Sequence, residues 1–320
     1  MKTTANPVTA SAVPPAPDVV LRPLRAEDLE AVVALDRRSV GPSRRGYFEK
    51  RLQAALRQPK RHLQFALTTP KGLVGFLQAR IAGGEYGRPK ESVILEAVGV
   101  DPAARHAGLG QRMMAGLEEL MRSRGIEHLL TQVDWRNHAM LKFLDAARFE
   151  LAPRHLLERK VDRIPLPSDD AEIEKWPPVV RHLQARDFDA IVRIDSRVTG
   201  KARSEYFKRK FDEVLNESAI AVSLVAESDG FPVAFAMARV DSGDFGHVEP
   251  VAALDTIGVD PGFARKGYAR AVLEQMVENL AALHVERLET EISNDAVELQ
   301  KFLVRFGFGP SQRLSFQRVL

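Results

Sequence analysis

The chain contains two copies of one sequence pattern, and this internal repeat limits the folds it can adopt more than any other feature. The segment VGVDPAARHAGLGQRMM, which begins at Val98, aligns with IGVDPGFARKGYARAVL, which begins at Ile257, at an offset of 159 residues. The same offset relates Tyr47–Phe48 to Tyr206–Phe207, so the register holds far upstream of the motif. A repeat of this length indicates a duplicated domain.

The repeat divides the 320 residues into four segments. We expect one domain at 18–161 and a second at 179–320, packed together as an internal pseudo-dimer. Residues 1–17 are rich in Ala, Pro and Thr and lack the apolar core of a signal peptide, which predicts a disordered leader. Residues 162–178 contain four prolines and five acidic residues, which predicts an extended linker.

Each copy alternates between helical and strand-like apolar spacing. In the first copy, residues 26–36 have helical spacing, and strand-like runs follow at 63–69, 72–82 and 93–100. A second helical pattern comes next, then a further strand, a short helix and a terminal strand, and the second copy repeats this order. The sequence therefore predicts an α/β (α+β) fold, in which each domain has a mixed, mostly antiparallel sheet flanked by helices.

Composition excludes several classes of protein and site. The chain has no cysteine, which excludes disulfides, thiolate metal sites and a cysteine nucleophile, and favours a reducing, cytoplasmic location. The eight histidines show no HxH or HxxxH spacing, so we expect no metal. No apolar run is long enough for a membrane span. The net charge of +3 is uneven, since the first copy is basic and the second slightly acidic. The basic residues have few of the interleaved aromatics typical of nucleic-acid binding, which favours a solvated helical face, with an acidic substrate or nucleic acid as the alternatives.

A glycine-containing loop joins a strand to a helix in each copy. In the first copy it reads Arg105-His-Ala-Gly108-Leu-Gly110. Glycine lets backbone amides approach a ligand closely, and a helix N-terminus presents unpaired N–H groups. Such a loop can hold a diphosphate, although two glycines before a helix are also typical of an ordinary turn. The spacing fits neither the Walker loop nor the dinucleotide-binding GxGxxG pattern.

This segment resembles the signature of the GNAT superfamily of acyl-CoA-dependent N-acetyltransferases, which is Gln/Arg-x-x-Gly-x-Gly/Ala after a strand ending in Val-x-Pro. The first copy matches it in full, at Val100, Pro102, Arg105, Gly108 and Gly110. The second copy matches it in part. Val259, Pro261, Gly267 and Ala269 fit, but Ala264 stands where Gln or Arg is expected.

The resemblance implies that each loop binds the pyrophosphate of acetyl-CoA and that the preceding strand pairs through its backbone with the pantetheine. The implied cofactor-binding residues of the first copy are Val98, Gly99, Val100, Arg105, His106, Ala107, Gly108, Leu109, Gly110, Gln111 and Asn137. Those of the second copy are Ile257, Gly258, Val259, Arg265, Lys266, Gly267, Tyr268, Ala269 and Arg270. We expect the first copy to be the better binder, because its motif is complete.

Acetyl transfer to an amine requires that the ammonium lose a proton, and a carboxylate can accept it. Glu96 and its equivalent Asp255 lie on the strand before the loop, where the resemblance implies a base or a water-holding group. A salt bridge is the structural alternative. Alternation along the strand predicts that Glu96 shares a face with Ile94, Val98 and Val100, opposite Leu95 and Ala97.

The chain departs from the family at the residue that protonates the leaving thiolate. Many members have a tyrosine seven residues after the motif asparagine, whereas this chain has Leu144 and, in the second copy, Leu303. A thiolate with a pKa near ~8.5 is a tolerable leaving group, so the substitution does not exclude activity. The duplicated pair Tyr47–Phe48 lies in the region that lines the acceptor site in this family, but a buried pair holding two helices together is the simpler interpretation.

The leading hypothesis is an acetyl-CoA-dependent N-acetyltransferase, an EC 2.3.1-type acyltransferase that acts on a primary amine of a small molecule or peptide. Transfer would be direct, within a ternary complex, because no cysteine is present to carry the acyl group. The alternative is a non-catalytic acyl-CoA-binding sensor or scaffold, in one or both halves, which the missing tyrosines and Ala264 favour. Nucleic-acid binding ranks third.

Overall fold

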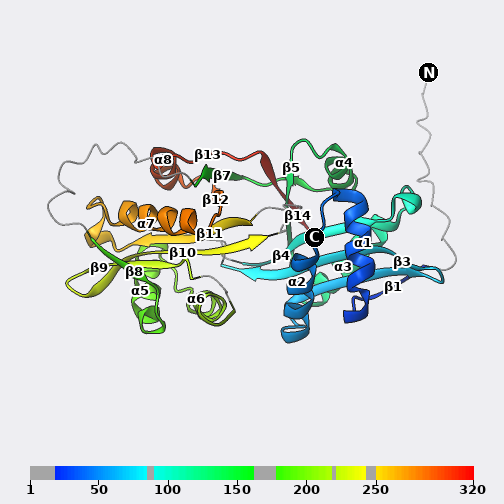
Figure 1. Cartoon of the computed structure of the whole chain (residues 1–320), viewed down its shortest axis with the longest axis horizontal. Helices are drawn as coiled ribbons and strands as arrows, with labels where there is room; N and C mark the ends of the chain where they lie inside the picture. Colours follow the sequence, from blue (N-terminus) through cyan, green and yellow to red (C-terminus); the bar gives the residue numbers. More distant parts are fainter. Residues whose placement is uncertain (1–18, 85–89, 162–177, 218–220, 243–249) are drawn as a thin grey trace, which may run out of the picture.

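The computed structural model describes residues 19–84, 90–161, 178–217, 221–242 and 250–320. The predicted leader at 1–17 and nearly all of the predicted linker at 162–178 lie outside the described residues. Two seven-stranded mixed sheets lie end to end, each with helices packed against it (Figure 1). The predicted fold class is confirmed. In the described part of the chain, no helix has both the length and the apolar character needed to cross a membrane.

The first half begins with a short strand and two helices, continues with three long strands, and then alternates helices with strands. Its elements are β1 (Val20–Pro23), η1 (Ala26–Asp28), α1 (Leu29–Val40), α2 (Arg45–Arg57), β2 (His62–Thr69), β3 (Gly72–Gly83), β4 (Glu91–Val100), η3 (Pro102–Ala104), α3 (Leu109–Ser123), β5 (His128–Asp134), α4 (His138–Ala146), β6 (Glu150–Leu151) and β7 (Arg154–Lys160). Helix α3 packs on the sheet because Met113, Leu117 and Met121 recur every four residues and are fully buried.

The second half repeats this order. Its elements are β8 (Val179–His182), η5 (Ala185–Asp187), α5 (Phe188–Thr199), α6 (Ser204–Asp212), η6 (Glu213–Glu217), β9 (Leu224–Ser228), β10 (Phe231–Ser242), β11 (Pro250–Val259), η8 (Pro261–Phe263), α7 (Tyr268–Ala282), β12 (Arg287–Ser293), α8 (Val297–Arg305), β13 (Gly309–Pro310) and β14 (Arg313–Val319). Helix α7 buries Val272, Met276 and Leu280 in the same way as α3.

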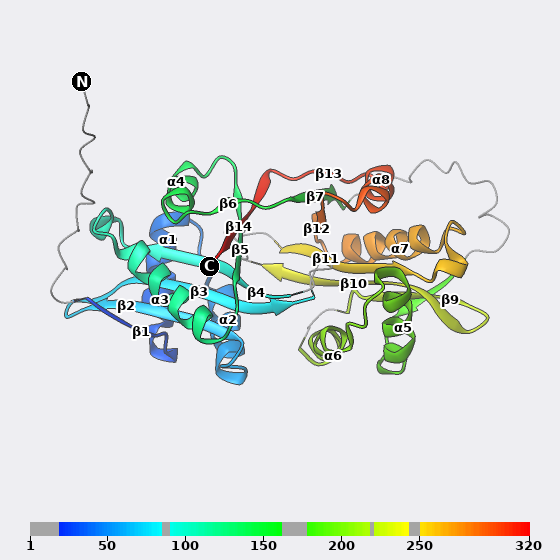
Figure 2. The same ribbon diagram turned by 180° about the vertical axis from the view of Figure 1, so that it is seen from behind.

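The two halves exchange their terminal strands. One sheet has the order β1-β2-β3-β4-β5-β14-β6, and the other has the order β13-β7-β12-β11-β10-β9-β8. Strand β14, the last of the chain, pairs antiparallel with β5 of the first half, while β7 pairs antiparallel with β12 of the second half (Figure 2). From the sequence, each terminal strand was predicted to complete the sheet of its own copy. Instead, each half needs the other to complete its sheet.

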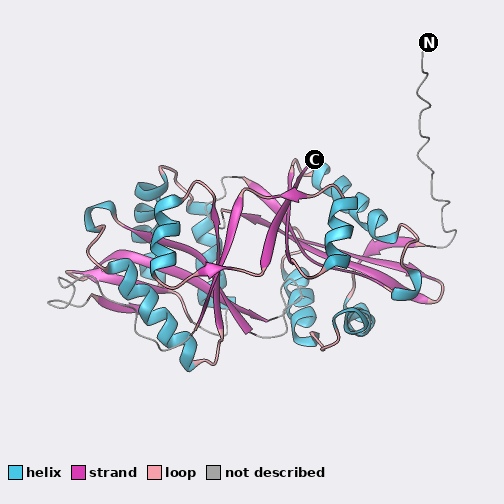
Figure 3. Ribbon diagram, turned by 90° about the horizontal axis from the view of Figure 1, so that it is seen from above, coloured by secondary structure: helices cyan, strands magenta, loops and turns pink. Residues whose placement is uncertain are grey.

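Symmetric hydrogen bonds fasten the exchanged strands. The Arg159 guanidinium, on β7, donates to the carbonyl of Phe306 at 2.8 Å, and the equivalent Arg318, on β14, donates to that of Ala147 at 2.6 Å. Each arginine therefore satisfies a carbonyl at the end of a helix in the other half. The exchanged strands lie where the halves meet, with helices on both faces of each sheet (Figure 3).

Strand β4 contains a β-bulge at Glu96. In its pairing with β3, Leu95 faces Ala79 and Ala97 faces Gln78, so Glu96 is an extra residue on its strand. Strand β11 skips Asp255 in the same way. A bulge reverses the alternation that follows it.

The bulge makes the predicted face assignment of β4 wrong. Val98 and Val100 pack in the same core cluster as Leu95, beneath α3. Ala97 lies in the cluster formed with α1 and α2, on the other side of the sheet. The strict alternation assumed from the sequence holds only up to the bulge.

Candidate functional site

The loop after β4 has a tightly turned backbone in front of α3. His106 and Gly108 have left-handed conformations, with φ of 67° and 70°. Such a conformation is uncommon in a non-glycine residue such as His106. Helix α3 begins at Leu109, so its first N–H groups follow the turn directly and have no intrahelical acceptor. A Cβ added to Gly108 would meet no atom within 4 Å, which shows that the space beside the turn is open.

The loop after β11 repeats this conformation. Arg265 and Gly267 have φ of 60° and 81°, and α7 begins at the next residue, Tyr268. The departure from the family signature at Ala264 therefore leaves the backbone of the second loop unchanged. The halves differ in the side chains around the turn rather than in the backbone donors.

The strand before each loop has an open edge. Strand β4 pairs with its parallel neighbour β5 only over Ser92–Ile94, and β11 pairs with β12 only over Val251–Ala253. The later residues of each strand, Val98–Val100 and Ile257–Val259, have no strand partner on that side among the described residues. An extended ligand can add to such an edge through backbone hydrogen bonds.

The side chains of the predicted cofactor residues divide into exposed and packed groups. The exposed group is Arg105, His106, Ala107, Gln111, Arg265 and Lys266. The Arg105 guanidinium lies 3.3 Å from the Ser39 hydroxyl on α1. Leu109 is buried in the core, and Tyr268 packs edge-on against Phe263. Only the backbone of Leu109 is therefore available to a ligand, whereas the half-buried Tyr268 side chain keeps some exposed surface.

Asn137 has a structural role at the start of α4. Its side-chain oxygen accepts a hydrogen bond from the backbone N–H of Met140 at 3.1 Å, which caps the helix. Its equivalent, Ala296, provides no such cap for α8. The predicted contact of Asn137 with a cofactor stays a prediction.

Glu96 is a buried carboxylate held by two arginines. Its side chain is 3% exposed, and its Oε1 atom accepts from Arg80 Nε at 2.7 Å and lies 3.1 Å from the guanidinium of Arg51. Arg80 comes from β3 and Arg51 from α2. The structure therefore shows the ion pair that the sequence analysis gave as the alternative to a catalytic role, and the catalytic role stays a prediction.

Asp255 is held in the same manner. Its side chain is 2% exposed, and it contacts Arg239 from β10 and Lys210 from α6, the latter at 2.8 Å. These cations stand 159 residues after Arg80 and Arg51, so the whole arrangement is duplicated. None of these four cations was predicted from the sequence as a partner of the carboxylates. The repeat did contain a sign of them, because the 159-residue offset aligns Arg51 with Lys210 and Arg80 with Arg239.

The sites of the missing tyrosines lie in the core. Leu144 and Leu303 are each 1% exposed, and neither provides a hydroxyl group. The duplicated aromatic pairs are buried as well. Phe48 packs edge-on against Tyr47 on one side and against Phe76 of β3 on the other, which agrees with a packing role. Among the described residues, no group of three His, Asp or Glu residues is placed to hold a metal.

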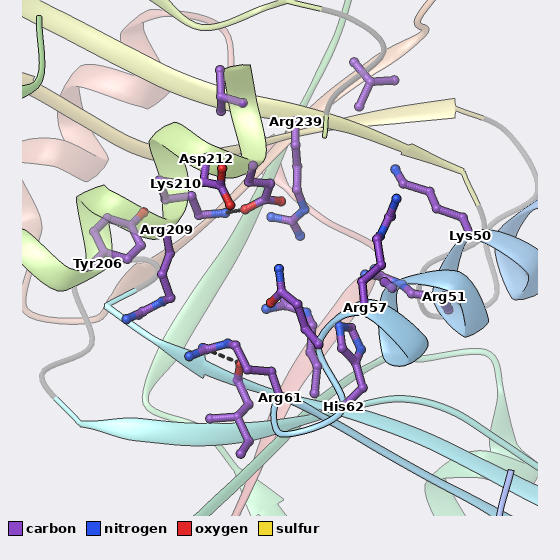
Figure 4. A pocket seen from close by; sticks show the side chains of 17 residues that line it. Lys50, Arg51, Arg57, Arg61, His62, Tyr206, Arg209, Lys210, Asp212 and Arg239 are labelled. Carbon is purple, nitrogen blue, oxygen red and sulfur yellow. Dashed lines mark hydrogen bonds and ion pairs between the residues drawn. The ribbon is translucent and has the colours of Figure 1, made fainter. Parts of the chain in front are cut away.

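A cavity of about 180 Å³ lies between the two halves. Its walls come from α2, the start of β2 and the end of β3 on one side and from α6 and β10 on the other, with basic side chains converging on the space (Figure 4). Arg51, Arg80, Lys210 and Arg239 all line it. Glu96 and Asp255, from different halves, therefore lie behind the walls of one cavity.

The charges around this cavity shift two pKa values. Burial, together with Arg51, Arg80 and Arg61, lowers the pKa of His62 to about 4. Burial would raise the pKa of Glu213, but the opposing charges of Lys210 and Arg239 lower it to about 2. Both shifts indicate a positive electrostatic potential in the cavity.

An open strand edge, a turn with left-handed residues and a helix N-terminus occur together twice, so the fold is that of an α/β protein built from two equivalent units. The sequence profile of the Acetyltransferase (GNAT) family matches residues 29–148 and 186–308. The chain therefore belongs to the acetyltransferase (GNAT) family, with two such domains in tandem. A comparison with curated proteins gives no significant match.

Solved structures share this fold across nearly the whole chain. A GCN5-related N-acetyltransferase from Sphaerobacter thermophilus is 16% identical, with 94% of this chain and 95% of that chain covered and a TM-score of 0.62. A tandem GNAT protein from the clavulanic acid biosynthesis pathway is 15% identical, with 94% and 98% covered and a TM-score of 0.64. N-myristoyltransferase from Saccharomyces cerevisiae is 16% identical, with 97% and 82% covered and a TM-score of 0.62. At these identities the likeness shows the fold alone.

Proposed function

We propose that this protein is an acetyl-CoA-dependent N-acetyltransferase that transfers the acetyl group directly to a primary amine. The observation that carries the proposal is the duplicated turn with left-handed residues at His106 and Gly108, and at Arg265 and Gly267, in front of a helix. The family membership supports an acyl-CoA as the donor. The choice of the acetyl group and of an amine acceptor is our inference.

Each half has backbone groups suited to an acyl-CoA. The N–H groups at the start of α3 and α7 would bind the pyrophosphate, and charge-assisted hydrogen bonds would come from exposed Arg105 in the first half and from exposed Arg265 and Lys266 in the second. The open edges at Val98–Val100 and Ile257–Val259 would pair with the pantetheine. When bound, the thioester supplies an activated acyl group. We propose the first half as the tighter binder, because its motif is complete, whereas Ala264 replaces the expected Gln or Arg in the second half.

Glu96 and Asp255 are the proposed proton acceptors. Each carboxylate lies at a bulge, where its side chain does not follow the regular alternation of the strand. The two cations that contact each carboxylate hold it in place. An incoming amine must lose a proton before it can attack, and either carboxylate could accept that proton directly or through water.

The same ion pairs favour the second candidate function, a non-catalytic acyl-CoA sensor. Each carboxylate already contacts two cations, and Leu144 and Leu303 provide no acid for a leaving thiolate. The two functions share the coenzyme site but differ in turnover.

The test incubates the full chain with acetyl-CoA and a panel of amines while the release of free CoA thiol is followed. The panel contains polyamines, aminoglycosides, amino acids and peptides. Transferase activity predicts amine-dependent CoA release that falls in Glu96→Gln or Asp255→Asn while acetyl-CoA affinity is kept. Binding of acetyl-CoA without release for any amine would support the sensor instead.

A further inference from the structure

One buried side chain of the first half lacks a hydrogen-bond partner at both of its polar atoms. Gln78, in the middle of β3, is 1% exposed, and neither its Nε2 nor its Oε1 atom has a partner among the described residues. Exchanging the amide nitrogen and oxygen would not change this, because both atoms are unpartnered. Such groups are rare in folded proteins and cost free energy. Packing alone therefore does not explain a glutamine here.

Gln78 lies beside Glu96 on one face of the sheet. The residues before and after Gln78 on β3 pack in the core beneath α3, so Gln78 itself faces α1 and α2. Glu96 points to the same face, because it contacts Arg51 of α2. Across the strands, Gln78 pairs with Ala97, the residue that follows Glu96 at the bulge. The unpartnered amide is therefore a neighbour of the proposed proton acceptor.

The second half has an apolar side chain at the equivalent position. Met237 stands 159 residues after Gln78, pairs with Thr256 beside the equivalent bulge and is fully buried. The aromatic rings on this face of each sheet are duplicated too, in the same edge-on arrangement. Methionine has nearly the length of glutamine and is also unbranched. The fold therefore accepts an apolar side chain at this position and does not need the amide.

The cavity between the halves gives one approach to this amide. Arg51 and Arg80, which contact Glu96, both line the cavity. Arg80 stands two residues after Gln78 on the same face of β3, in a stretch that pairs regularly with β2. A molecule whose amino group reaches Glu96 from the cavity therefore also comes beside Gln78.

The chemistry of the amide limits what it recognises. Its NH₂ group donates hydrogen bonds and its carbonyl oxygen accepts them, so a hydroxyl group, which both donates and accepts, suits it. A methyl group in the same place would leave both amide atoms without a partner. At Met237 the preference is reversed, because a hydroxyl group would find no such partner in that side chain.

We propose that Gln78 is a specificity-determining residue, through which the first half takes an amine that also carries a hydroxyl group, whereas the second half takes an apolar amine. This inference rests on the proposed function, because it concerns the acceptor of the acetyl group. The free energy that the unpartnered amide costs the ligand-free protein is offset when the hydroxyl group binds.

The activity test compares propanolamine with butylamine, which have the same length and differ by a hydroxyl group in place of a methyl group. Gly267→Glu blocks the second turn, so CoA release in this background reports the first half. There kcat/KM should be at least about tenfold higher for propanolamine. Gln78→Met should remove this preference and leave CoA affinity unchanged. In the Gly108→Glu background, which reports the second half, Met237→Gln should create the preference.

Thermal unfolding of the ligand-free full chain tests the same residue without a reaction. Gln78→Met removes two unpartnered polar atoms from the core and should raise Tm by at least about 2 °C. Met237→Gln, the reciprocal change, should lower Tm. Gln132→Met is the control, because Gln132 donates to Glu291 at 2.8 Å, and it should lower Tm as well. An unchanged or lower Tm in Gln78→Met would overturn the proposal, since the amide would then be satisfied within the fold.

The activity outcomes separate this inference from the proposed function. Absence of CoA release with every amine of the panel would count against the proposed function itself. CoA release with other amines, but no preference for propanolamine in the Gly267→Glu background, would overturn this inference alone. A preference that Gln78→Met leaves unchanged would do the same.

Discussion

Replacement of Glu96 by glutamine is expected to destabilise the protein as well as to slow any reaction. The Glu96 side chain is 3% exposed, and its partners Arg51 and Arg80 are 12% and 16% exposed. Glutamine keeps the shape but removes the charge, which leaves two guanidinium groups close together without their anion. Removal of one member of a buried ion pair typically costs about 3–5 kcal/mol.

The cost here should lie at or just below the lower end of that range, because the two arginines line a cavity that water can enter. We expect a loss of about 2–3 kcal/mol, which at about 2–4 °C per kcal/mol for domains of this size lowers Tm by about 4–12 °C. Urea denaturation followed by circular dichroism measures the free energy of unfolding. Glu119→Gln, at an exposed position of α3, is the control and should change it by less than about 0.5 kcal/mol.

A coupling measurement distinguishes the ion pair from a general effect of the substitution. In the double variant Glu96→Gln/Arg80→Gln, one of the two cations that contact Glu96 is also removed, so the combined loss should be smaller than the sum of the single losses by about 0.5–3 kcal/mol. Additive losses, or a Glu96→Gln variant as stable as the parent, would refute the assigned electrostatic role. Activity of Glu96→Gln is then compared with the parent well below both melting temperatures, so that unfolding does not contribute.

Three further predictions test other parts of the structure. The folded protein holds the pKa of His62 at about 4, whereas the unfolded chain has the ordinary value of 6.5, so the free energy of unfolding should fall as pH drops between these values. His62→Gln should reduce that fall. An equal loss of stability in the parent and in His62→Gln, measured by urea denaturation at pH 7, 5.5 and 4.5, would contradict this. Deletion of residues 312–320 removes β14, so hydrogen exchange should accelerate in β5 of the first half; faster exchange in β12 instead would argue against the strand exchange. Ala296→Asn should cap α8 as Asn137 caps α4 and raise stability by about 1 kcal/mol, measured by urea denaturation; no gain would mean that the cap geometry differs.

Much of each half could be predicted from the sequence, because the repeat and the apolar spacing carry the information. The constant offset indicated the duplication, and the glycine pattern before α3 indicated the turn. The exchange of β7 and β14 could not be predicted in this way. A period-2 pattern shows that a segment is a strand, but two copies with similar patterns leave its partner undetermined.

The site was only partly predictable for two different reasons. The bulge at Glu96 has no glycine or proline to mark it, so strict alternation was assumed and Val98 was assigned to the wrong face. The cations beside the carboxylates, such as Arg51 and Lys210, lie far from them in sequence. Their shared offset was visible, but their distance from Glu96 and Asp255 depends on how α2 and α6 pack against the sheets.

Calorimetric titration of CoA into the parent chain and two loop variants tests the central claim most directly. Gly108→Glu and Gly267→Glu each place a bulky anion at a left-handed position in one of the two turns. If the turns hold the coenzyme diphosphate, each single variant should lose binding in its own half, with the larger loss of affinity in Gly108→Glu, and the double variant should bind no CoA. Unchanged CoA binding in the double variant, or no heat from the parent at millimolar CoA and acetyl-CoA, would contradict the account.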